Sequence, residues 1–157
     1  MNRLIIGMLL GFLFSGEFLS AQNRNDFKNS TGMKDLELTE VWDKVFPQSD
    51  QVEHHKVTFV NRYGITLAAD MYVPKGIEGK LPAIAVSGPF GAVKEQVSGL
   101  YAQTMAERGF LTIAFDPSFT GESGGEPRYV ASPDINTEDF CAAVDYLSVC
   151  DLSLIHI

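Results

Sequence analysis

The chain has 157 residues and a formal net charge of −8 at pH 7. This length is enough for one domain with its own hydrophobic core. The acidic balance argues against nucleic acid and anionic membrane surfaces as partners, because both repel negative charge. The two cysteines, Cys141 and Cys150, are too few to build a disulfide scaffold.

The first segment, residues 1–21, has the pattern of a secretory signal peptide. Arg3 supplies a positive charge, residues 4–14 form a short apolar run, and Ala21 is a small residue at a suitable cleavage site. The run is shorter than a bilayer-spanning helix requires. We therefore expect an exported protein, periplasmic or extracellular, with no stable membrane span after cleavage. An uncleaved anchor is the alternative interpretation.

Residues 22–50 divide into a polar leader and an N-terminal arm. The leader, residues 22–32, has no hydrophobic periodicity. Residues 33–46 predict a short helix that ends before Pro47, because most of their apolar residues fall on one side of a helix. The residues of that side are Leu36, Val41, Trp42, Val45 and Phe46. We expect the arm to pack onto the domain through its tryptophan.

Apolar and polar residues alternate between residues 52 and 73, which is the pattern of half-buried strands. Asn61 and Gly64 stand between the two alternating runs and are turn residues. The sequence therefore predicts an antiparallel hairpin. His54 and His55 are adjacent on its first strand, so they point to opposite faces and cannot act together as ligands or as a base.

Residues 82–116 predict a βαβ unit. The apolar runs 83–86 and 110–115 indicate buried strands, and residues 96–108 between them indicate a helix that ends at Gly109. Strands joined by such a crossover are parallel. The apolar stripe expected to face the sheet consists of Val97, Leu100, Tyr101 and Met105.

A long irregular loop, residues 117–131, precedes the last predicted helix. Pro133 suits a first helical turn, and Asn136 or Thr137 is the expected cap. Cys141 is expected to be a small buried hydrophobe on this helix. The stripe expected to face the sheet consists of Phe140, Ala143, Val144 and Leu147.

Four segments of the chain carry a likeness to a known family. They are VSGPFGAVKEQ (86–96), LYAQTMAERG (100–109), FDPSFTGESGGEPR (115–128) and ASPDINTEDFCAAVDYL (131–147). In this order they resemble the α/β-hydrolase superfamily, and within it the dienelactone-hydrolase-like bacterial branch. The resemblance implies the N-terminal half of an α/β-hydrolase fold over residues 51–149, which stops before the nucleophile elbow. Residues 150–157 depart from the family pattern, so we interpret the chain as a fragment with an off-pattern tail.

The resemblance also implies the chemistry of the full-length protein. Such enzymes hydrolyse ester, lactone or amide bonds with a Ser or Cys nucleophile, a histidine and an acid. We expect all three catalytic residues beyond this chain, and we expect neither a metal nor a cofactor. The full-length form would act on a small ester-like substrate, while this chain alone is predicted to be inactive. The alternative is a non-catalytic binding or remnant protein built on half a hydrolase domain.

The loop after the first parallel strand is the candidate functional element. Pro89 has no N–H, so Phe90 offers the first backbone donor and Gly91 the next. Fixed amides stabilise the oxyanion of acyl transfer, and the resemblance assigns an oxyanion-hole amide to this loop. The pattern alone leaves open a tight connection without a chemical role. A phosphate-binding loop is disfavoured, because Lys94 is followed by Glu95, and these two residues are expected to pair or to cap the helix.

Other polar residues of the chain receive structural interpretations. Residues 121–125 match the G-x-S-x-G pattern around Ser123, but no strand ends directly before them and no helix follows. Ser123 is therefore not expected to be a nucleophile. For Asp116 and Glu122 a place at the mouth of the active site is the alternative, but a solvated loop is expected, because carboxylates are exposed by default.

Overall fold

The computed structural model describes residues 36–39 and 41–154 of the chain. The expected signal peptide, residues 1–21, lies outside the described residues, and so do the polar leader and residues 155–157. In the part of the chain that is described, no helix has the length and apolar character needed to cross a lipid bilayer.

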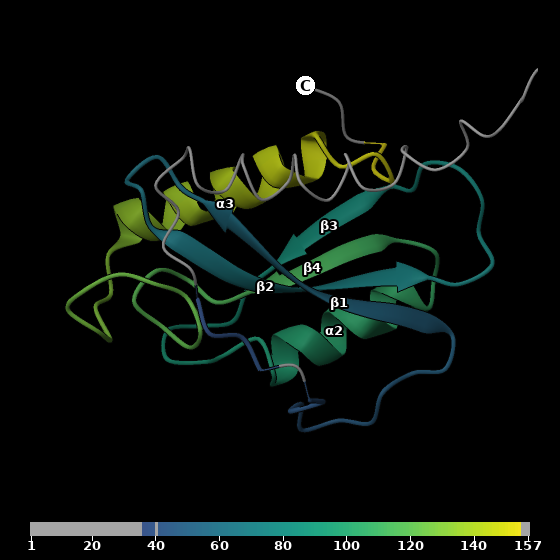
Figure 1. The fold of residues 1–157 in the computed structure, drawn as a ribbon, viewed down its shortest axis with the longest axis horizontal. Coiled ribbons are helices and arrows are strands. Elements are labelled where there is room, and N and C mark those ends of the chain that lie inside the picture. The colour runs from purple at the N-terminus through teal and green to yellow at the C-terminus, as the bar shows by residue number, and fades with distance from the viewer. Residues whose placement is uncertain (1–35, 40, 155–157) are drawn as a thin grey trace, which may run out of the picture. The chain divides into compact units, whose positions relative to one another are not determined.

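The described residues form a mixed four-stranded sheet with two helices (Figure 1). The elements are β1 (Val52–Val60), β2 (Thr66–Pro74), β3 (Ala83–Val86), α2 (Val97–Ala106), β4 (Leu111–Phe115) and α3 (Pro133–Ser148). The strands lie in the order β1-β2-β4-β3, and β2 is antiparallel to both β1 and β4. The strands β3 and β4 are parallel. The predicted hairpin and the predicted βαβ unit are both confirmed.

The two helices cover opposite faces of the sheet (Figure 1). The core on the α3 side consists of Phe59, Leu67, Ala69, Leu81, Leu111, Ile113, Phe115, Ala142, Ala143 and Leu147. The core on the α2 side is smaller and consists of Val52, Tyr72, Ala102, Ala106 and Ala114, with Trp42 and Val86 packed against it. Every residue of β4 is buried, as expected for a strand covered on both faces.

The predicted orientation of α2 is wrong. The residues that it buries are Ser98, Gly99, Ala102, Gln103 and Ala106. Val97 and Tyr101 of the predicted stripe are 76% and 53% exposed. Small residues face inward because the helix lies close to its neighbours: a Cβ on Gly99 would lie 3.1 Å from the Phe46 ring and 3.2 Å from the Tyr72 hydroxyl. Close approach, rather than hydropathy, selects the buried face of this helix.

The predicted cap of α3 is also wrong. Ser132, rather than Asn136 or Thr137, is the N-cap, and its Oγ accepts a hydrogen bond from the N–H of Ile135 at 3.4 Å. Pro133 stands in the first turn as predicted. Because proline has no N–H to satisfy, it fits the position directly after the cap.

The buried face of α3 differs in part from the predicted stripe. Ala143 and Leu147 are buried as predicted. Three residues are exposed, against the prediction, namely Phe140, Cys141 and Val144. The helix turns a polar residue inward instead, because the Asp139 carboxylate accepts hydrogen bonds from Asn61 Nδ2 at 2.8 Å and from the Ser118 N–H at 2.8 Å.

The N-terminal arm has no helix over the residues of 36–46 that the structure describes. Its backbone bonds to the rest of the domain instead, since the Val45 N–H donates to the carbonyl oxygen of Glu95 at 3.1 Å. The indole Nε1 of Trp42 donates to the carbonyl oxygen of Phe46 at 2.8 Å, and the ring packs on the core beside α2. The arm therefore lies against the domain through its tryptophan, although not as a helix.

Leu81, just before the edge strand β3, pairs with the segment of residues 152–154. The Leu81 N–H donates to the carbonyl oxygen of Leu152, and the Leu154 N–H donates to the carbonyl oxygen of Leu81, both at 2.7 Å. The bridge between Leu81 and Ser153 is parallel. This segment therefore lies where a further parallel strand would begin, and the off-pattern interpretation of residues 150–157 stays a prediction.

Candidate active site

The loop between β3 and α2, residues 87–96, is here called the β3–α2 loop. The Ala92 N–H donates to the carbonyl oxygen of Pro89 at 2.9 Å, and Gly91 has a φ of +84°, whereas φ of Phe90 is negative. This combination is a type II turn, whose third position favours glycine. The turn places the N–H groups of Phe90 and Gly91 in succession just beyond the carboxyl end of β3.

Both of these amides are available to a ligand. Among the described residues, neither the Phe90 N–H nor the Gly91 N–H has a hydrogen-bond acceptor, and Phe90 is 65% exposed. Successive backbone N–H groups without internal acceptors can bind an anionic oxygen. Their place beyond the carboxyl end of a parallel strand is the edge at which α/β sheets bind ligands.

Asp116, directly after β4, holds the far end of the β3–α2 loop. Its carboxylate accepts the backbone N–H of Lys94 at 2.8 Å, Nζ of Lys94 at 2.8 Å and the N–H of Glu122 at 3.0 Å. The expectation that Asp116 is solvated is wrong: it is 0% exposed, because these donors replace water. Gly121 makes room for it, since a Cβ there would lie 2.2 Å from Asp116 Oδ2.

Lys94 lies at the centre of a buried charged cluster. Its side chain is 0% exposed, and Nζ lies 2.8 Å from Asp116 Oδ2, 2.8 Å from Glu122 Oε2 and 2.5 Å from Glu95 Oε1. Burial lowers the pKa of Lys94, but the neighbouring carboxylates, Asp116 first, raise it above its ordinary value. Lys94 therefore stays charged. The predicted pairing with Glu95 is confirmed, and the sequence missed the other two partners.

Glu122 connects this cluster to the N-terminal arm. Its Oε1 accepts the N–H of Thr39 at 2.7 Å, and its Oε2 lies 2.6 Å from Lys56 Nζ and 2.8 Å from Lys94 Nζ. Burial raises the pKa of Glu122, but the hydrogen bonds from Lys56 and Lys94 outweigh burial and lower the pKa to about 2. Glu122 is therefore ionised at neutral pH, and its side chain, only 18% exposed, does not belong to a solvated loop.

Three carboxylates of the cluster have the spacing of a cation site. Oxygens of Asp43, Glu95 and Glu122 lie within 4.8 Å of one another. Lys56 Nζ lies 3.4 Å, 3.8 Å and 2.6 Å from the same three side chains, so an ammonium group already serves as their counter-ion. We therefore describe this group as an ion-pair network and not as a metal centre.

Ser123, at the centre of the G-x-S-x-G pattern, has a structural place. Ser123 is 2% exposed. Its Oγ donates to the carbonyl oxygen of Asp116 at 2.7 Å and accepts a hydrogen bond from the N–H of Ala68 at 2.8 Å. Both bonds join the loop after β4 to β2 and β4. Among the described residues, the hydrogen-bond partners of this hydroxyl are both backbone groups, and neither can act as a base.

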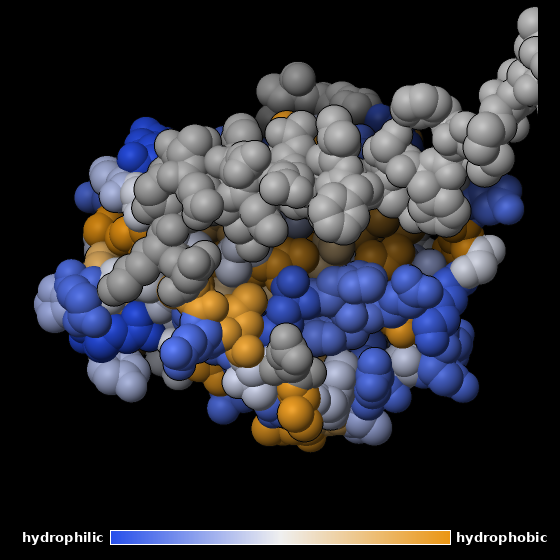
Figure 2. Space-filling view, in the orientation of Figure 1, coloured by the Kyte–Doolittle hydropathy of each residue, from blue (hydrophilic) through white to orange (hydrophobic). Residues whose placement is uncertain are grey.

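The adjacent histidines lie on opposite faces, as predicted. His54 Nε2 lies 2.8 Å from Asp70 Oδ1, whereas the His55 side chain is 52% exposed. Figure 2 shows hydrophilic side chains gathered over β1, the outer strand that carries both residues. Neither histidine has a contact with the β3–α2 loop among the described residues.

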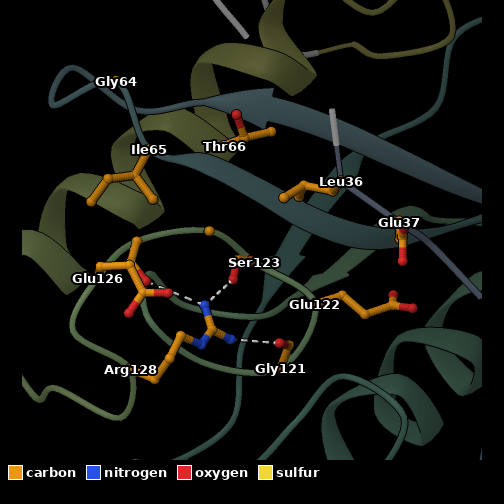
Figure 3. A pocket seen from close by; sticks show the side chains of 12 residues that line it. Leu36, Glu37, Gly64, Ile65, Thr66, Gly121, Glu122, Ser123, Glu126 and Arg128 are labelled. Carbon is orange, nitrogen blue, oxygen red and sulfur yellow. Dashed lines mark hydrogen bonds between the residues drawn. The ribbon is translucent and has the colours of Figure 1, made fainter. Parts of the chain in front are cut away.

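The irregular loop that follows β4, residues 117–131, is here called the glycine-rich loop. A hollow of about 600 Å³ lies beside it (Figure 3). Arg128 contacts this loop by donating to the carbonyl oxygens of Gly121 at 2.6 Å and Ser123 at 2.5 Å. The residues that line the hollow come from the arm, the β1–β2 turn and the glycine-rich loop, and none comes from the β3–α2 loop. The hollow is therefore separate from the free amides.

Sequence comparisons place the chain among known proteins. The family described as X-Pro dipeptidyl-peptidase (S15 family) matches residues 63–151. Uncharacterized protein PA2218 of Pseudomonas aeruginosa is 75% identical over 115 residues, which cover 73% of this chain and 31% of that protein. Thiohydrolase aneE of Aspergillus aculeatus is 31% identical over 99 residues, which cover 63% of this chain and 30% of that protein. The chain thus spans about a third of the length of these relatives.

Solved structures agree with these matches. The crystal structure of the PA2218 protein is similar with a TM-score of 0.76 and 70% identity, over 77% of this chain and 38% of that one. The α/β hydrolase GrgF from Penicillium is similar with a TM-score of 0.59 and 25% identity, over 64% and 34%. The described domain is therefore the N-terminal part of an α/β-hydrolase fold. With a match over residues 63–151, the chain belongs to the X-Pro dipeptidyl-peptidase (S15) family.

Proposed function

We propose that this chain is the N-terminal part of an exported hydrolase, similar to dienelactone hydrolases, that cleaves ester, thioester, lactone or amide bonds of a small substrate. The Phe90 N–H, assisted by the Gly91 N–H, binds the oxyanion of the reaction. Membership of a family described by a dipeptidyl-peptidase supports hydrolysis of an acyl bond, and the name of a thiohydrolase relative supports a thioester as one such bond. The export step rests on the signal-peptide pattern of residues 1–21.

The proposed mechanism divides the work between this chain and the remainder of the whole protein. A nucleophile attacks the substrate carbonyl carbon, and negative charge develops on the carbonyl oxygen. Amides fixed about 2.7–3.1 Å from that oxygen stabilise the charge. The nucleophile, the histidine and the acid are supplied by the rest of the protein, so this chain alone does not turn over substrate.

One observation carries the proposal: two successive amides just beyond the carboxyl end of β3 have no acceptor among the described residues. Both residues are exposed, so the two N–H groups face solvent and a ligand can reach them. A pair left free on an ordered turn, braced behind by Asp116, is what an oxyanion-binding loop requires. Ser123 offers no competing site, because its hydroxyl is bonded to backbone.

The test uses a hybrid hydrolase, defined as the whole Pseudomonas relative in which the matched segment comes from this chain. We expect the hybrid to hydrolyse short-chain p-nitrophenyl esters or thioesters. In the hybrid, Phe90→Pro deletes one N–H, while a type II turn accepts proline at its second position. We expect kcat to fall about 100- to 1000-fold, as for the loss of one oxyanion donor.

The matched control is Phe90→Ala, which keeps the N–H and removes only the ring. We expect kcat of this variant to stay within about threefold of the parent, since the proposed donor remains. A folded hybrid that cleaves none of the esters or thioesters would contradict the proposed reaction. Equal kcat values for Phe90→Pro and the parent would contradict the proposed role of the amide.

A further inference from the structure

We propose that Asp116, with Lys94 as its counter-ion, is a positioning residue that orients the Phe90 and Gly91 amides for oxyanion binding. This inference rests on the proposed function and adds a residue that acts on the site through the loop. Asp116 does not touch the substrate in this account. Its effect reaches the substrate only through the backbone of the β3–α2 loop.

The β3–α2 loop is fixed to β4 at two points. At its beginning, Ser87 Oγ donates to the carbonyl oxygen of Phe115 at 3.1 Å. Near its end, the Lys94 N–H donates to Asp116 Oδ1 at 2.8 Å. The turn that carries the free amides lies between these two points. Loss of the second bond would therefore leave the turn attached to β4 at one end only.

The carboxylate of Asp116 also joins two loops to each other. Its Oδ2 accepts the Glu122 N–H at 3.0 Å, so one side chain binds the backbone of the β3–α2 loop and of the glycine-rich loop. Gly121 has a φ of +53° and no Cβ, which lets the carboxylate reach both. Misplacement of a catalytic donor by about 1 Å reduces turnover about 100-fold, so such bracing has kinetic consequences.

Lys94 is needed because a buried carboxylate behind an oxyanion site would otherwise repel the developing negative charge. Its ammonium group lies 2.8 Å from Asp116 Oδ2, and both side chains are 0% exposed. A charge pair in such a place is only weakly screened by water. Lys94 therefore offsets negative charge of Asp116 behind the turn, and the geometry of the pair is fixed by two hydrogen bonds between the same two residues.

The hybrid hydrolase allows a matched comparison of two buried pairs. D116A/K94M removes the brace without leaving an unpaired charge between these two residues. K44M/D70A removes another Lys–Asp pair, 3.1 Å apart and also 0% exposed, that has no contact with the turn. We expect D116A/K94M to lower kcat about 30- to 100-fold with KM within about threefold, and K44M/D70A to keep kcat within about threefold.

A double-mutant cycle with Phe90→Pro identifies the route of the effect. If Asp116 acts through the Phe90 amide, adding D116A/K94M to Phe90→Pro lowers kcat by less than about threefold more. Two outcomes would overturn the inference and leave the proposed function standing. In the first, Phe90→Pro lowers kcat strongly but D116A/K94M leaves kcat unchanged. In the second, both changes lower kcat and their effects multiply in the combined variant. No effect of Phe90→Pro would overturn the proposed function itself.

A measurement on the 157-residue chain avoids dependence on the hybrid. Backbone ¹⁵N relaxation reports the mobility of the Phe90 and Gly91 amides directly. We expect order parameters near about 0.85 in the parent and below about 0.6 in D116A/K94M, with parent values in K44M/D70A. Equal order parameters in all three proteins would contradict a positioning role for Asp116.

Discussion

Two aspartates of this domain are both 0% exposed but are satisfied in different ways. Asp116 accepts hydrogen bonds from an ammonium group and two backbone amides. Among the described residues, the donors to Asp139 are neutral groups, namely Asn61 Nδ2 at 2.8 Å, the Ser118 N–H at 2.8 Å and Ser118 Oγ at 2.7 Å. One carboxylate belongs to a charged network at the candidate site, and the other joins α3 to the hairpin turn.

The difference separates two uses of a buried carboxylate. Hydrogen bonds to Asp139 connect three segments of the fold, and none of its partners touches the β3–α2 loop. The Asp116 cluster does touch that loop, and its charges extend to the arm through Glu122. Changes at either aspartate should therefore destabilise the domain, but only changes at Asp116 should alter turnover in the hybrid hydrolase.

The largest expected loss of stability is at Asp139. Asp139→Ala leaves the buried N–H and hydroxyl of Ser118 without their acceptor, and each such group costs about 1–3 kcal/mol, while Asn61 Nδ2 keeps Ser118 Oγ as a second acceptor. We expect the free energy of unfolding, measured by urea denaturation, to fall by about 3 kcal/mol or more. Asp145→Ala, an exposed carboxylate on the same helix, should change it by less than about 0.5 kcal/mol. Equal losses in the two variants would show that Asp139 does not join these segments.

The second prediction of a loss of stability is at Gly121, which leaves space for the Asp116 carboxylate. Gly121→Ala introduces a Cβ 2.2 Å from Asp116 Oδ2 at a φ of +53°, so we expect a loss of about 3 kcal/mol. Gly76→Ala is the matched control, because its φ is +72° but no atom lies within 4 Å of the new Cβ. The control should lose about 1 kcal/mol from backbone strain alone. Similar urea midpoints for both variants would argue against close packing around Asp116.

The dependence of stability on acid pH should test the ion pairs of the charged cluster. The folded pKa of Glu122, about 2, is below its ordinary value of 4.5. Its contribution to stability is therefore complete above about pH 4.5 and is lost as the pH falls toward 2. We expect the unfolding free energy of the parent to fall more steeply over this window than that of Glu122→Gln. The exposed Glu78→Gln variant should follow the parent, and parallel curves for the parent and Glu122→Gln would contradict the assigned ion pairs.

The smallest expected effect is at the cap of the helix that carries Asp139. Ser132→Ala removes the side-chain acceptor for the Ile135 N–H and should cost about 1 kcal/mol in urea denaturation. Ser148→Ala, at the other end of α3, should cost less than about 0.5 kcal/mol. A Ser132→Ala variant that is as stable as the parent would contradict the assignment of Ser132 as the cap.

Local signals explain which parts of the fold could be predicted. The alternation of apolar and polar residues over 52–73 indicates strands, and Gly109 indicates the end of a helix. The predictions of the hairpin and of the βαβ unit are therefore correct. The buried face of α2 depends on how closely Phe46 of the arm approaches Gly99. Such contacts join distant segments, and hydropathy along one helix does not report them.

The candidate site, too, could be predicted from the sequence only where neighbouring residues carry the signal. Because Pro89 lacks a donor, Phe90 and Gly91 carry the first amides after it, and this can be read from neighbouring residues. The burial of Asp116 depends on Lys94 and Glu122, which return to it from two loops. A single sequence offers only one hint, namely an aspartate directly after a fully buried strand and before a glycine-rich loop.

The most direct test is a crystal structure of the hybrid hydrolase inhibited by a phosphonate ester, whose phosphoryl oxygen stands in for the oxyanion. The account predicts that this oxygen lies about 2.7–3.1 Å from the Phe90 nitrogen, with Asp116 still bonded to the Lys94 N–H. A phosphoryl oxygen more than about 4 Å from both the Phe90 and the Gly91 nitrogens would contradict the central claim.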